Sequence, residues 1–271
     1  MLVFLYTSFL LTIPLFAQET YNCVPFQTNF DSPETVSNIN DVNPFSSPFI
    51  ALSPPESYAT SSDRGLTLRL LPPDGGARRN GSVNDKLGIG ATVNSTFIIG
   101  RGSITTFEME SAQQAGSIVA AIWTDSNDNL NDAVRRDEID WELISADQEA
   151  YQTNFYAPTE NDPSPHYGIF GERHRTQNGS TISETHQYSI LLAEDRIEWA
   201  VDGIIVRTHS KENSYIDGAL WWPRHNFVVS LGIWDGSGAK GTSHWAKGPI
   251  MWDEVVEPIE VFVKMVKVEC I

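Results

Sequence analysis

The sequence has few basic residues and no repetitive or low-complexity segment. Of its 271 residues, 18 are Lys or Arg and 35 are Asp or Glu, which gives a formal net charge of -17. A charge of this sign repels polyphosphates and anionic lipids, so we expect no nucleic-acid partner. Because 41% of the residues are apolar, the composition predicts a globular protein and excludes a disordered or collagen-like one.

Charged side chains are absent from the first seventeen residues, which are apolar through Leu11 and end on the small Ala17. This pattern predicts a secretory signal peptide over residues 1–17. A membrane anchor is the alternative, but the apolar run is shorter than the roughly 20 residues that a span needs. No later segment is long and apolar enough for a span. We therefore expect a secreted protein, extracellular or in a cell wall, with no membrane span in the mature chain.

Only two cysteines are present, Cys23 and Cys270, at opposite ends of the mature chain. In an oxidising compartment each has only the other as a partner, so we predict a disulfide between them, with two free thiols as the alternative. Three glycosylation sequons, at Asn80, Asn94 and Asn178, suit a secreted glycoprotein and predict exposed loops at these positions.

Amphipathic helices longer than two turns are lacking, and short β-favouring runs recur instead, with turn residues between them. The expected strands cover residues 65–71, 92–100, 103–110, 117–124, 137–144, 151–157, 187–193, 196–209, 226–234 and 260–270. Within the run over 196–209, an Asp202-Gly203 pair predicts a hairpin turn. About ten strands without helical crossovers predict one all-β domain over residues 18–271, an antiparallel β-sandwich or jelly roll.

Two segments show neither strand nor helix periodicity. Residues 18–64 are expected to form loops and short edge structure. Residues 236–248 begin with a Gly-Ser-Gly-Ala-Lys-Gly run that matches a dinucleotide-binding pattern, but residues 242–249 do not predict the helix that such a site needs. We expect this second segment to be a flexible loop at a cleft. The six histidines show no metal-ligand spacing, so we predict no metal and no other cofactor.

Three carboxylates alternate with apolar side chains in the run Glu138-Ile139-Asp140-Trp141-Glu142. On a strand the three acids share one face. A purely structural role rarely requires such a row, whereas glycoside hydrolysis uses two carboxyl groups with separated pKa values. The Cα atoms of the outer two are expected roughly 13 Å apart, and inward-leaning side chains can bring their carboxyls toward the roughly 5 Å of a retaining pair. A solvated acidic strand and a calcium site are the alternatives.

These acids also carry a family resemblance. The run resembles the ExDxE signature of glycoside hydrolase family 16, and neighbouring blocks are similar to that family over most of residues 65–268. The blocks are Glu184 to Tyr188, Gln152 to Tyr156, Ile197 to Gly203 (I-x-W-x-V-D-G) and Val206-Arg207. The blocks over 230–234 and 240–248 look most like the fungal Crh-type chitin and glucan transglycosylases.

The resemblance implies a concanavalin-like jelly roll with a concave substrate cleft and a retaining double-displacement mechanism. It assigns Glu138 as the nucleophile, Glu142 as the general acid and base, and Asp140 as the residue that orders the nucleophile and separates the pKa values. The implied substrate is a β-linked cell-wall polysaccharide, chitin or β-glucan. A hydrolytic endo-β-1,3(4)-glucanase and a catalytically silent lectin-like sandwich are the alternatives.

Aromatic and polar side chains near the matched blocks are candidates for sugar contacts. They are Trp123, Trp234, Trp245, Gln152, Asn154 and Tyr156. Aromatic rings stack on the apolar faces of pyranoses, and the amides at positions 152 and 154 share a strand face from which they can bond sugar hydroxyls. Core packing is the alternative for each tryptophan. A polar loop over 125–136 is also expected at the cleft.

Overall fold

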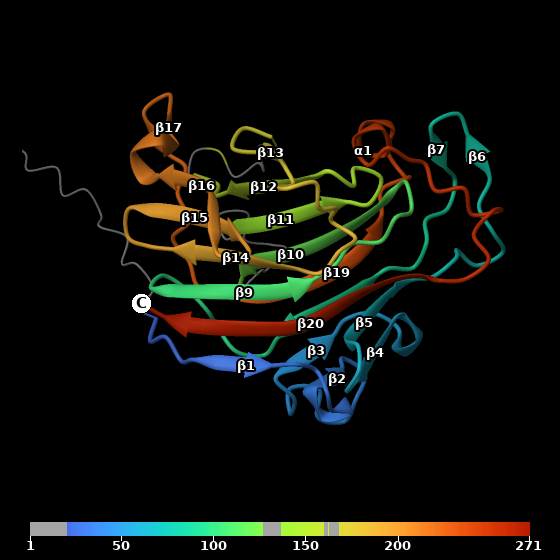
Figure 1. Ribbon diagram of the computed structural model, residues 1–271, viewed down its shortest axis with the longest axis horizontal. Helices are drawn as coiled ribbons and strands as arrows, with labels where there is room; N and C mark the ends of the chain where they lie inside the picture. Colours follow the sequence, from blue (N-terminus) through green and yellow to red (C-terminus); the bar gives the residue numbers. More distant parts are fainter. Residues whose placement is uncertain (1–20, 127–136, 160–161, 163–167) are drawn as a thin grey trace, which may run out of the picture.

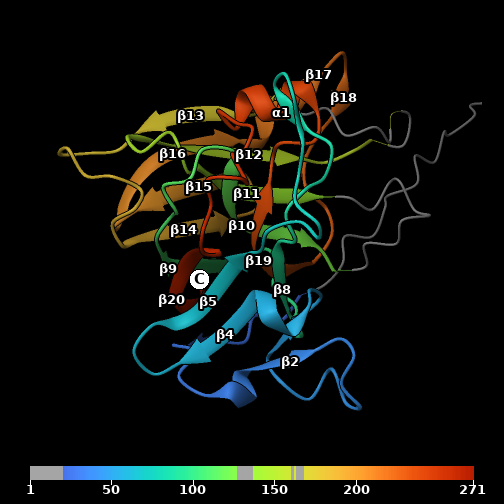
Figure 2. The same ribbon diagram turned by 90° about the vertical axis from the view of Figure 1, so that its right-hand side faces the viewer.

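The computed structural model describes residues 21–126, 137–159, 162 and 168–271. Two sheets of eight strands each dominate these ranges (Figure 1, Figure 2). No helix within them has both the length and the apolar character needed to cross a membrane. The expected signal peptide over residues 1–17 lies outside the described residues.

The sheet that carries the row of acids, called sheet I here, has the strand order β13-β12-β11-β10-β19-β8-β3-β2. Its strands are β2 (Val36–Asn38), β3 (Phe49–Ala51), β8 (Ala91–Ser95), β10 (Ser117–Asp125), β11 (Glu138–Ile144), β12 (Ala150–Tyr156), β13 (Glu172–Arg175) and β19 (Phe227–Asp235). Every neighbouring pair is antiparallel except β2 with β3. The acids therefore lie on an inner strand, with β10 on one side of it and β12 on the other.

Sheet II has the order β16-β15-β14-β9-β20-β5-β4, and β1 also pairs with β20. Its strands are β1 (Phe26–Thr28), β4 (Tyr58–Ser61), β5 (Gly65–Leu70), β9 (Ser103–Met109), β14 (His186–Leu192), β15 (Arg196–Val201), β16 (Ile204–Ser210) and β20 (Ile259–Cys270). Figure 1 shows β9 and β20 side by side, with the N-terminal β1 beside β20.

Smaller elements connect the sheets. They are η1 (Pro33–Thr35), η2 (Pro55–Ser57), η3 (Lys211–Ser214), α1 (Lys240–Trp245) and two short hairpins, β6 (Arg79–Asn80) with β7 (Val83–Asn84) and β17 (Tyr215–Ile216) with β18 (Ala219–Leu220). The predicted antiparallel all-β sandwich is thus confirmed.

Alternation along the strands decides which face of sheet I is covered. On β11, Ile139, Trp141 and Leu143 are fully buried between the sheets. The Trp141 ring meets Tyr188 of β14 edge to face, with 5.2 Å between ring centroids. Because successive side chains on a strand point to opposite faces, this packing places Glu138, Asp140 and Glu142 on the outer face of sheet I.

Most predicted strands are observed within one or two residues. The Asp202-Gly203 turn joins β15 to β16 as predicted, and both residues have positive φ, 51° and 77°, as a type I′ turn requires. The strand expected over 92–100 instead ends at Ser95. The described part of residues 18–64 forms loops and short strands, as expected. Strand β13 was not predicted, because its sequence, Glu-Arg-His-Arg, has no apolar alternation.

The segment over 236–248, predicted to be a loop, contains the helix α1, and that part of the prediction is wrong. The helix is closed by bonds from Ser243 N to Ala239 O and from Ala246 N to Thr242 O. Lys247 follows with φ of 55°. A helix this short has no room for an apolar repeat, so periodicity does not detect it.

The sequons differ in exposure. Asn80 and Asn178 are exposed, whereas Asn94 lies within β8 and is half-buried, paired across the sheet with Ser230. The expectation of an exposed loop at Asn94 is therefore wrong, because β8 lies between β3 and β19. Glycosylation of Asn80, Asn94 and Asn178 remains a prediction.

The predicted disulfide between Cys23 and Cys270 is present and joins residues 247 positions apart. Since β1 pairs with the last residues of β20, the bridge fixes the N-terminal segment to the end of sheet II. We expect a Cys23→Ser/Cys270→Ser variant to lose about 2–4 kcal/mol of unfolding free energy, because its unfolded chain is no longer cross-linked. Urea denaturation measures this loss. An unchanged midpoint would contradict the expectation.

Candidate active site

The three acids of β11 each face a polar residue of β12 across the sheet. The register pairs Glu138 with Tyr156, Asp140 with Asn154, and Glu142 with Gln152. On the other side of Glu142 lies Ala120 of β10, which is in turn paired with Gly232 of β19. Small residues thus lie beside Glu142, with a ladder of polar side chains on the β12 side.

This outer face borders a cleft of about 680 Å³. The residues that line it are Glu138, Asp140, Glu142, Gln152, Thr153, Asn154, Tyr156, Gly168, Gly171, Trp234, Gly241, Thr242 and Trp245. The structure therefore brings together the acids and five of the six predicted sugar-contact residues. The loop expected at the cleft over 125–136 falls mostly outside the described residues.

Tyr156 holds one end of the row. Its hydroxyl donates a hydrogen bond of 2.7 Å to Oε2 of Glu138. Sequence reasoning placed Tyr156 in contact with sugar and missed this bond, which orients the carboxylate predicted to be the nucleophile. The register of the β11–β12 pair is the signal that would have revealed it, because positions 138 and 156 are directly opposite.

The environment separates the proton affinities of the acids. Burial raises the pKa of Glu142 to about 7, and the charge of Glu138 adds to the rise. Burial also raises the pKa of Asp140 well above its usual value, helped by the charges of Glu142 and Glu138 and opposed by Arg207. At mildly acidic pH the cleft therefore holds a protonated carboxyl at Glu142, as a general acid requires.

An aromatic platform lies next to this general-acid candidate. The rings of Trp234 and Trp245 are stacked, with centroids 5.8 Å apart and 24° between their planes. Helix α1 supplies Trp245, whose indole Nε1 donates a 3.0 Å hydrogen bond to Oε1 of Gln152. Because Gln152 is paired with Glu142, this bond fixes the platform relative to that acid.

Trp123 does not belong to the site. Its side chain is fully buried and packs against Phe227 in the core, with 5.7 Å between centroids. Trp123 occupies a core-facing position on β10, opposite the buried Ile139. The prediction that Trp123 contacts sugar is wrong, and the alternative, that it packs in the core, is correct.

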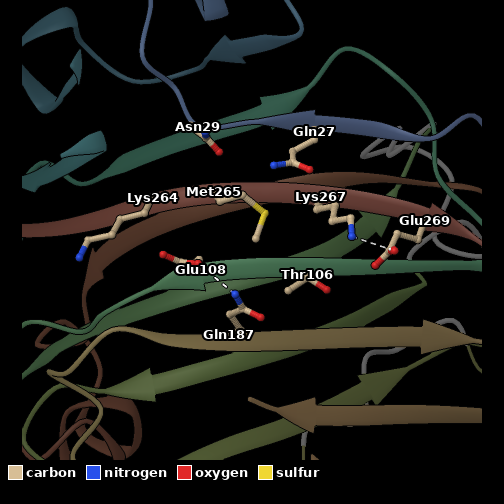
Figure 3. A pocket seen from close by; sticks show the side chains of 9 residues that line it. All are labelled: Gln27, Asn29, Thr106, Glu108, Gln187, Lys264, Met265, Lys267 and Glu269. Carbon is tan, nitrogen blue, oxygen red and sulfur yellow. Dashed lines mark hydrogen bonds and ion pairs between the residues drawn. The ribbon is translucent and has the colours of Figure 1, made fainter. Parts of the chain in front are cut away.

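A second groove, of about 470 Å³, lies on the outer face of sheet II (Figure 3). Its described lining residues include no aromatic side chain. Several polar groups there are bonded to one another, Lys267 to Glu269 at 2.8 Å and Gln187 to Glu108 at 3.1 Å. This groove lacks both the paired acids and the aromatic platform of the cleft on sheet I.

A buried ion cluster supports the strand that carries the acids. Asp137, directly before Glu138, and Asp125, at the end of β10, are both buried. His225 lies between them, with Nδ1 3.0 Å from Oδ2 of each. Within the described residues these three form the one group with ligand atoms close enough to hold a metal ion. At 3.0 Å both contacts are ion pairs of a protonated imidazole, whose single Nδ1–H can point to only one of the two carboxylates at a time.

A row of partly protonated acids, flanked by stacked tryptophans on the face of a β-sandwich, defines a carbohydrate-active class of protein. The chain belongs to the Glycosyl hydrolases family 16, whose sequence profile matches residues 56–254. The resemblance seen in the ExDxE run and its neighbouring blocks is thereby confirmed.

Two fungal proteins are similar to this chain in sequence. Crh-like protein 2 of Aspergillus fumigatus is 31% identical over 173 residues, covering 62% of this chain and 36% of that protein. Crh-like protein 1 of the same fungus is 32% identical over 188 residues, covering 65% of this chain and 45% of that protein. The chain thus spans less than half the length of these curated relatives.

Solved structures share the fold. The Crh5 transglycosylase in complex with NAG superposes with a TM-score of 0.65 at 21% identity, covering 92% of this chain and 88% of that one. The laminarinase catalytic domain of Thermotoga maritima gives 0.65 at 17% identity, covering 92% and 98%. Both confirm the predicted jelly-roll architecture.

Proposed function

We propose that the chain is a retaining glycosidase and transglycosylase that acts on a β-linked cell-wall polysaccharide, chitin or β-glucan. The observation that carries the proposal is the row of Glu138, Asp140 and Glu142 at the cleft, with the pKa of Glu142 raised to about 7. A lectin needs no such acid row, and the row distinguishes this function from sugar binding alone.

In the first step the carboxylate of Glu138 attacks the anomeric carbon while Glu142 gives its proton to the glycosidic oxygen. The bond to the leaving sugar breaks, and a glycosyl ester forms on Glu138. In the second step Glu142, now a carboxylate, takes a proton from water or from a sugar hydroxyl. That oxygen attacks the anomeric carbon and releases Glu138, so the configuration is retained. No cofactor takes part in this scheme.

Transfer to sugar requires an acceptor that is bound better than water. The stacked Trp234 and Trp245 offer an apolar surface on which a pyranose ring can rest near Glu142. The NAG bound to the Crh5 transglycosylase favours chitin as one substrate. The laminarinase neighbour favours β-glucan, and a purely hydrolytic endo-glucanase is the second candidate.

The deciding experiment incubates the protein with chitin oligomers and with β-1,3-glucan oligomers, separately and mixed, and weighs the products by mass spectrometry. We expect products longer than the donor, formed through the Glu138 ester. Shortened sugars alone would favour the hydrolase. Binding without any turnover would favour the lectin.

We expect Trp245→Ala to shift the product distribution from transfer toward hydrolysis, by about tenfold in the ratio of the two, because the acceptor loses its stacking surface. The matched control is Trp245→Phe, which keeps an aromatic ring and removes the bond to Gln152. If both variants leave the ratio at the wild-type value, the platform does not hold the acceptor.

We also propose that residues 18–271 act as one secreted domain at the cell wall. The disulfide between Cys23 and Cys270 supports this location, because such bonds persist in oxidising compartments. N-terminal sequencing of protein recovered from culture medium tests the signal peptide. An N-terminus near residue 18 is expected.

A further inference from the structure

Arg207 is the sole Lys or Arg among the buried residues of the described ranges. It lies on β16 of sheet II, but its guanidinium reaches sheet I. Nη1 donates to the backbone oxygen and to Oγ1 of Thr153, at 3.1 and 2.9 Å, and Nη2 donates to the backbone oxygen of Phe170. Burying a cation costs free energy unless the cation is paired. The buried position of Arg207 therefore indicates a role for its charge or its hydrogen bonds.

A chain of contacts leads from Arg207 to the central acid. The guanidinium carbon lies 4.4 Å from the centroid of the Trp199 ring. The indole Nε1 of Trp199 donates a 3.1 Å hydrogen bond to the backbone oxygen of Asp140. Thr153, which accepts hydrogen bonds from Arg207, is paired with Trp141. The guanidinium therefore fixes β11 and β12 from the side of sheet I that faces sheet II, next to Asp140.

We propose that Arg207 is a positioning residue for the acid row, which it holds in place through Trp199 and Thr153 while its positive charge balances Asp140. This inference rests on the proposed function of the cleft. It assigns to sheet II a part in the chemistry that takes place on sheet I.

The charges that act on Asp140 lie on two strands, and a third strand supplies the ion-pair partner of Arg207. Burial and the charges of Glu142 and Glu138, both on β11, raise its pKa, and Arg207 on β16 lowers it. Glu172 of β13 lies 3.2 Å from Nε of Arg207, with its side chain 54% exposed. Glu172 thus pairs with the guanidinium on its solvent-facing side, and we expect its negative charge to offset part of the field of Arg207.

Two histidines adjoin this ion pair. The pKa of His209 is lowered to about 4, mainly by burial. The charge of Arg207 also lowers it, and this effect is larger than the opposing effect of Glu172. Burial also lowers the pKa of His174, with Glu172 opposing and Arg207 reinforcing the effect. Both histidines are therefore neutral near pH 7. The charged groups in this region are then Arg207 and its partner Glu172.

The test exploits the exposed partner, because Arg207 itself supports the core. In Glu172→Gln the field of Arg207 is no longer offset, so we expect the pKa of Asp140 to fall by about 0.5 pH unit. Carbon-13 NMR titration of the side-chain carboxyls, on protein without substrate, measures it. The matched control is Glu260→Gln, which removes the partner of Arg69 on sheet II and should leave Asp140 unchanged.

Arg207→Lys separates charge from geometry. Lysine keeps the charge but not the planar fork, so we expect kcat to fall about tenfold with KM unchanged and the pKa of Asp140 near its wild-type value. Arg207→Met removes the charge as well, so we expect the pKa of Asp140 to rise in this variant, which the same NMR titration measures.

An unchanged pKa of Asp140 in Glu172→Gln would overturn the proposal, as would wild-type kcat in Arg207→Lys. The NMR titration needs no turnover. If the protein cleaves no glycan, the proposed function fails while the effect of Arg207 on Asp140 is still measured.

Discussion

Glu138→Gln is expected to lower kcat by about 10⁴-fold or more, because an amide cannot form the glycosyl ester. Glu142→Gln is expected to lose about 10²–10⁴-fold, since a general acid and base is removed while the nucleophile remains. Release of a defined oligosaccharide measures both. Near-wild-type turnover in Glu138→Gln would show that the nucleophile lies elsewhere.

Both variants are expected to fold. Each removes a charge from a crowded, half-buried row, so thermal unfolding should occur at the wild-type temperature or above it. The matched control is Glu108→Gln, which removes a strand carboxylate from the groove on the outer face of sheet II (Figure 3). It should leave kcat unchanged. A loss of activity accompanied by unfolding would not count as evidence for catalysis.

Azide distinguishes the two roles. In Glu138→Ala, azide can occupy the space of the lost carboxylate and attack an aryl β-glycoside directly, which yields the glycosyl azide of inverted configuration. In Glu142→Ala the ester on Glu138 still forms, and azide attacks that ester to give the retained product. The opposite pairing of products would exchange the assigned roles.

Local sequence predicted much of this protein because its strands alternate clearly. The period of two in the run from Glu138 to Glu142 defines both faces of β11 without any tertiary information. The hairpin at Asp202-Gly203 is likewise encoded in adjacent residues. The family blocks then indicated which outer face carries the chemistry.

The features that sequence missed depend on contacts between distant segments. The bond of Tyr156 to Glu138 requires the β11–β12 register. The burial of Trp123 depends on Phe227, more than one hundred positions away. Helix α1 is too short for a periodic signal, although it supplies the tryptophan that stacks on Trp234. In each case the local sequence pattern indicated the residue but not the distant residue that it contacts in the fold.

His225 shows the same limit and carries the second large expected effect. Sequence reasoning treated it as one of six scattered histidines, yet it lies between two buried carboxylates, Asp125 and Asp137. We expect His225→Ala to lower the free energy of unfolding by about 3–5 kcal/mol, because two buried acids lose the group between them. Urea denaturation at pH 6 measures this. The matched control is the exposed His244→Ala, which should change stability little.

The pH dependence has a definite sign. Burial lowers the pKa of His225, but the hydrogen bonds and charges of Asp125 and Asp137 outweigh burial and raise the pKa from 6.5 to about 9. The folded state therefore binds the proton more tightly than the unfolded chain does. The stability that this proton provides is complete below about pH 6.5 and is lost as the pH rises through about 9.

Glu142 also changes stability with pH, but in a lower range. Its pKa rises on folding from 4.5 to about 7, so its destabilising effect grows from about pH 4.5 and is complete slightly above pH 7. A decline in stability between pH 7 and 9 that is larger in the wild type than in His225→Ala thus reports on His225. A decline of equal size in both would contradict the ion cluster.

The cluster also bears on the chemistry, because Asp137 directly precedes Glu138. The backbone N–H of His225 donates to Oδ2 of Asp137 at 2.9 Å, so the imidazole and its own backbone hold the start of β11 together. In His225→Ala, adding Asp125→Asn removes one of the two negative charges that face the imidazole in the wild type and should recover part of the lost stability. If kcat at pH 6 recovers in parallel, the cluster acts by holding Glu138 in place. If stability recovers and kcat stays low, the imidazole itself positions the nucleophile.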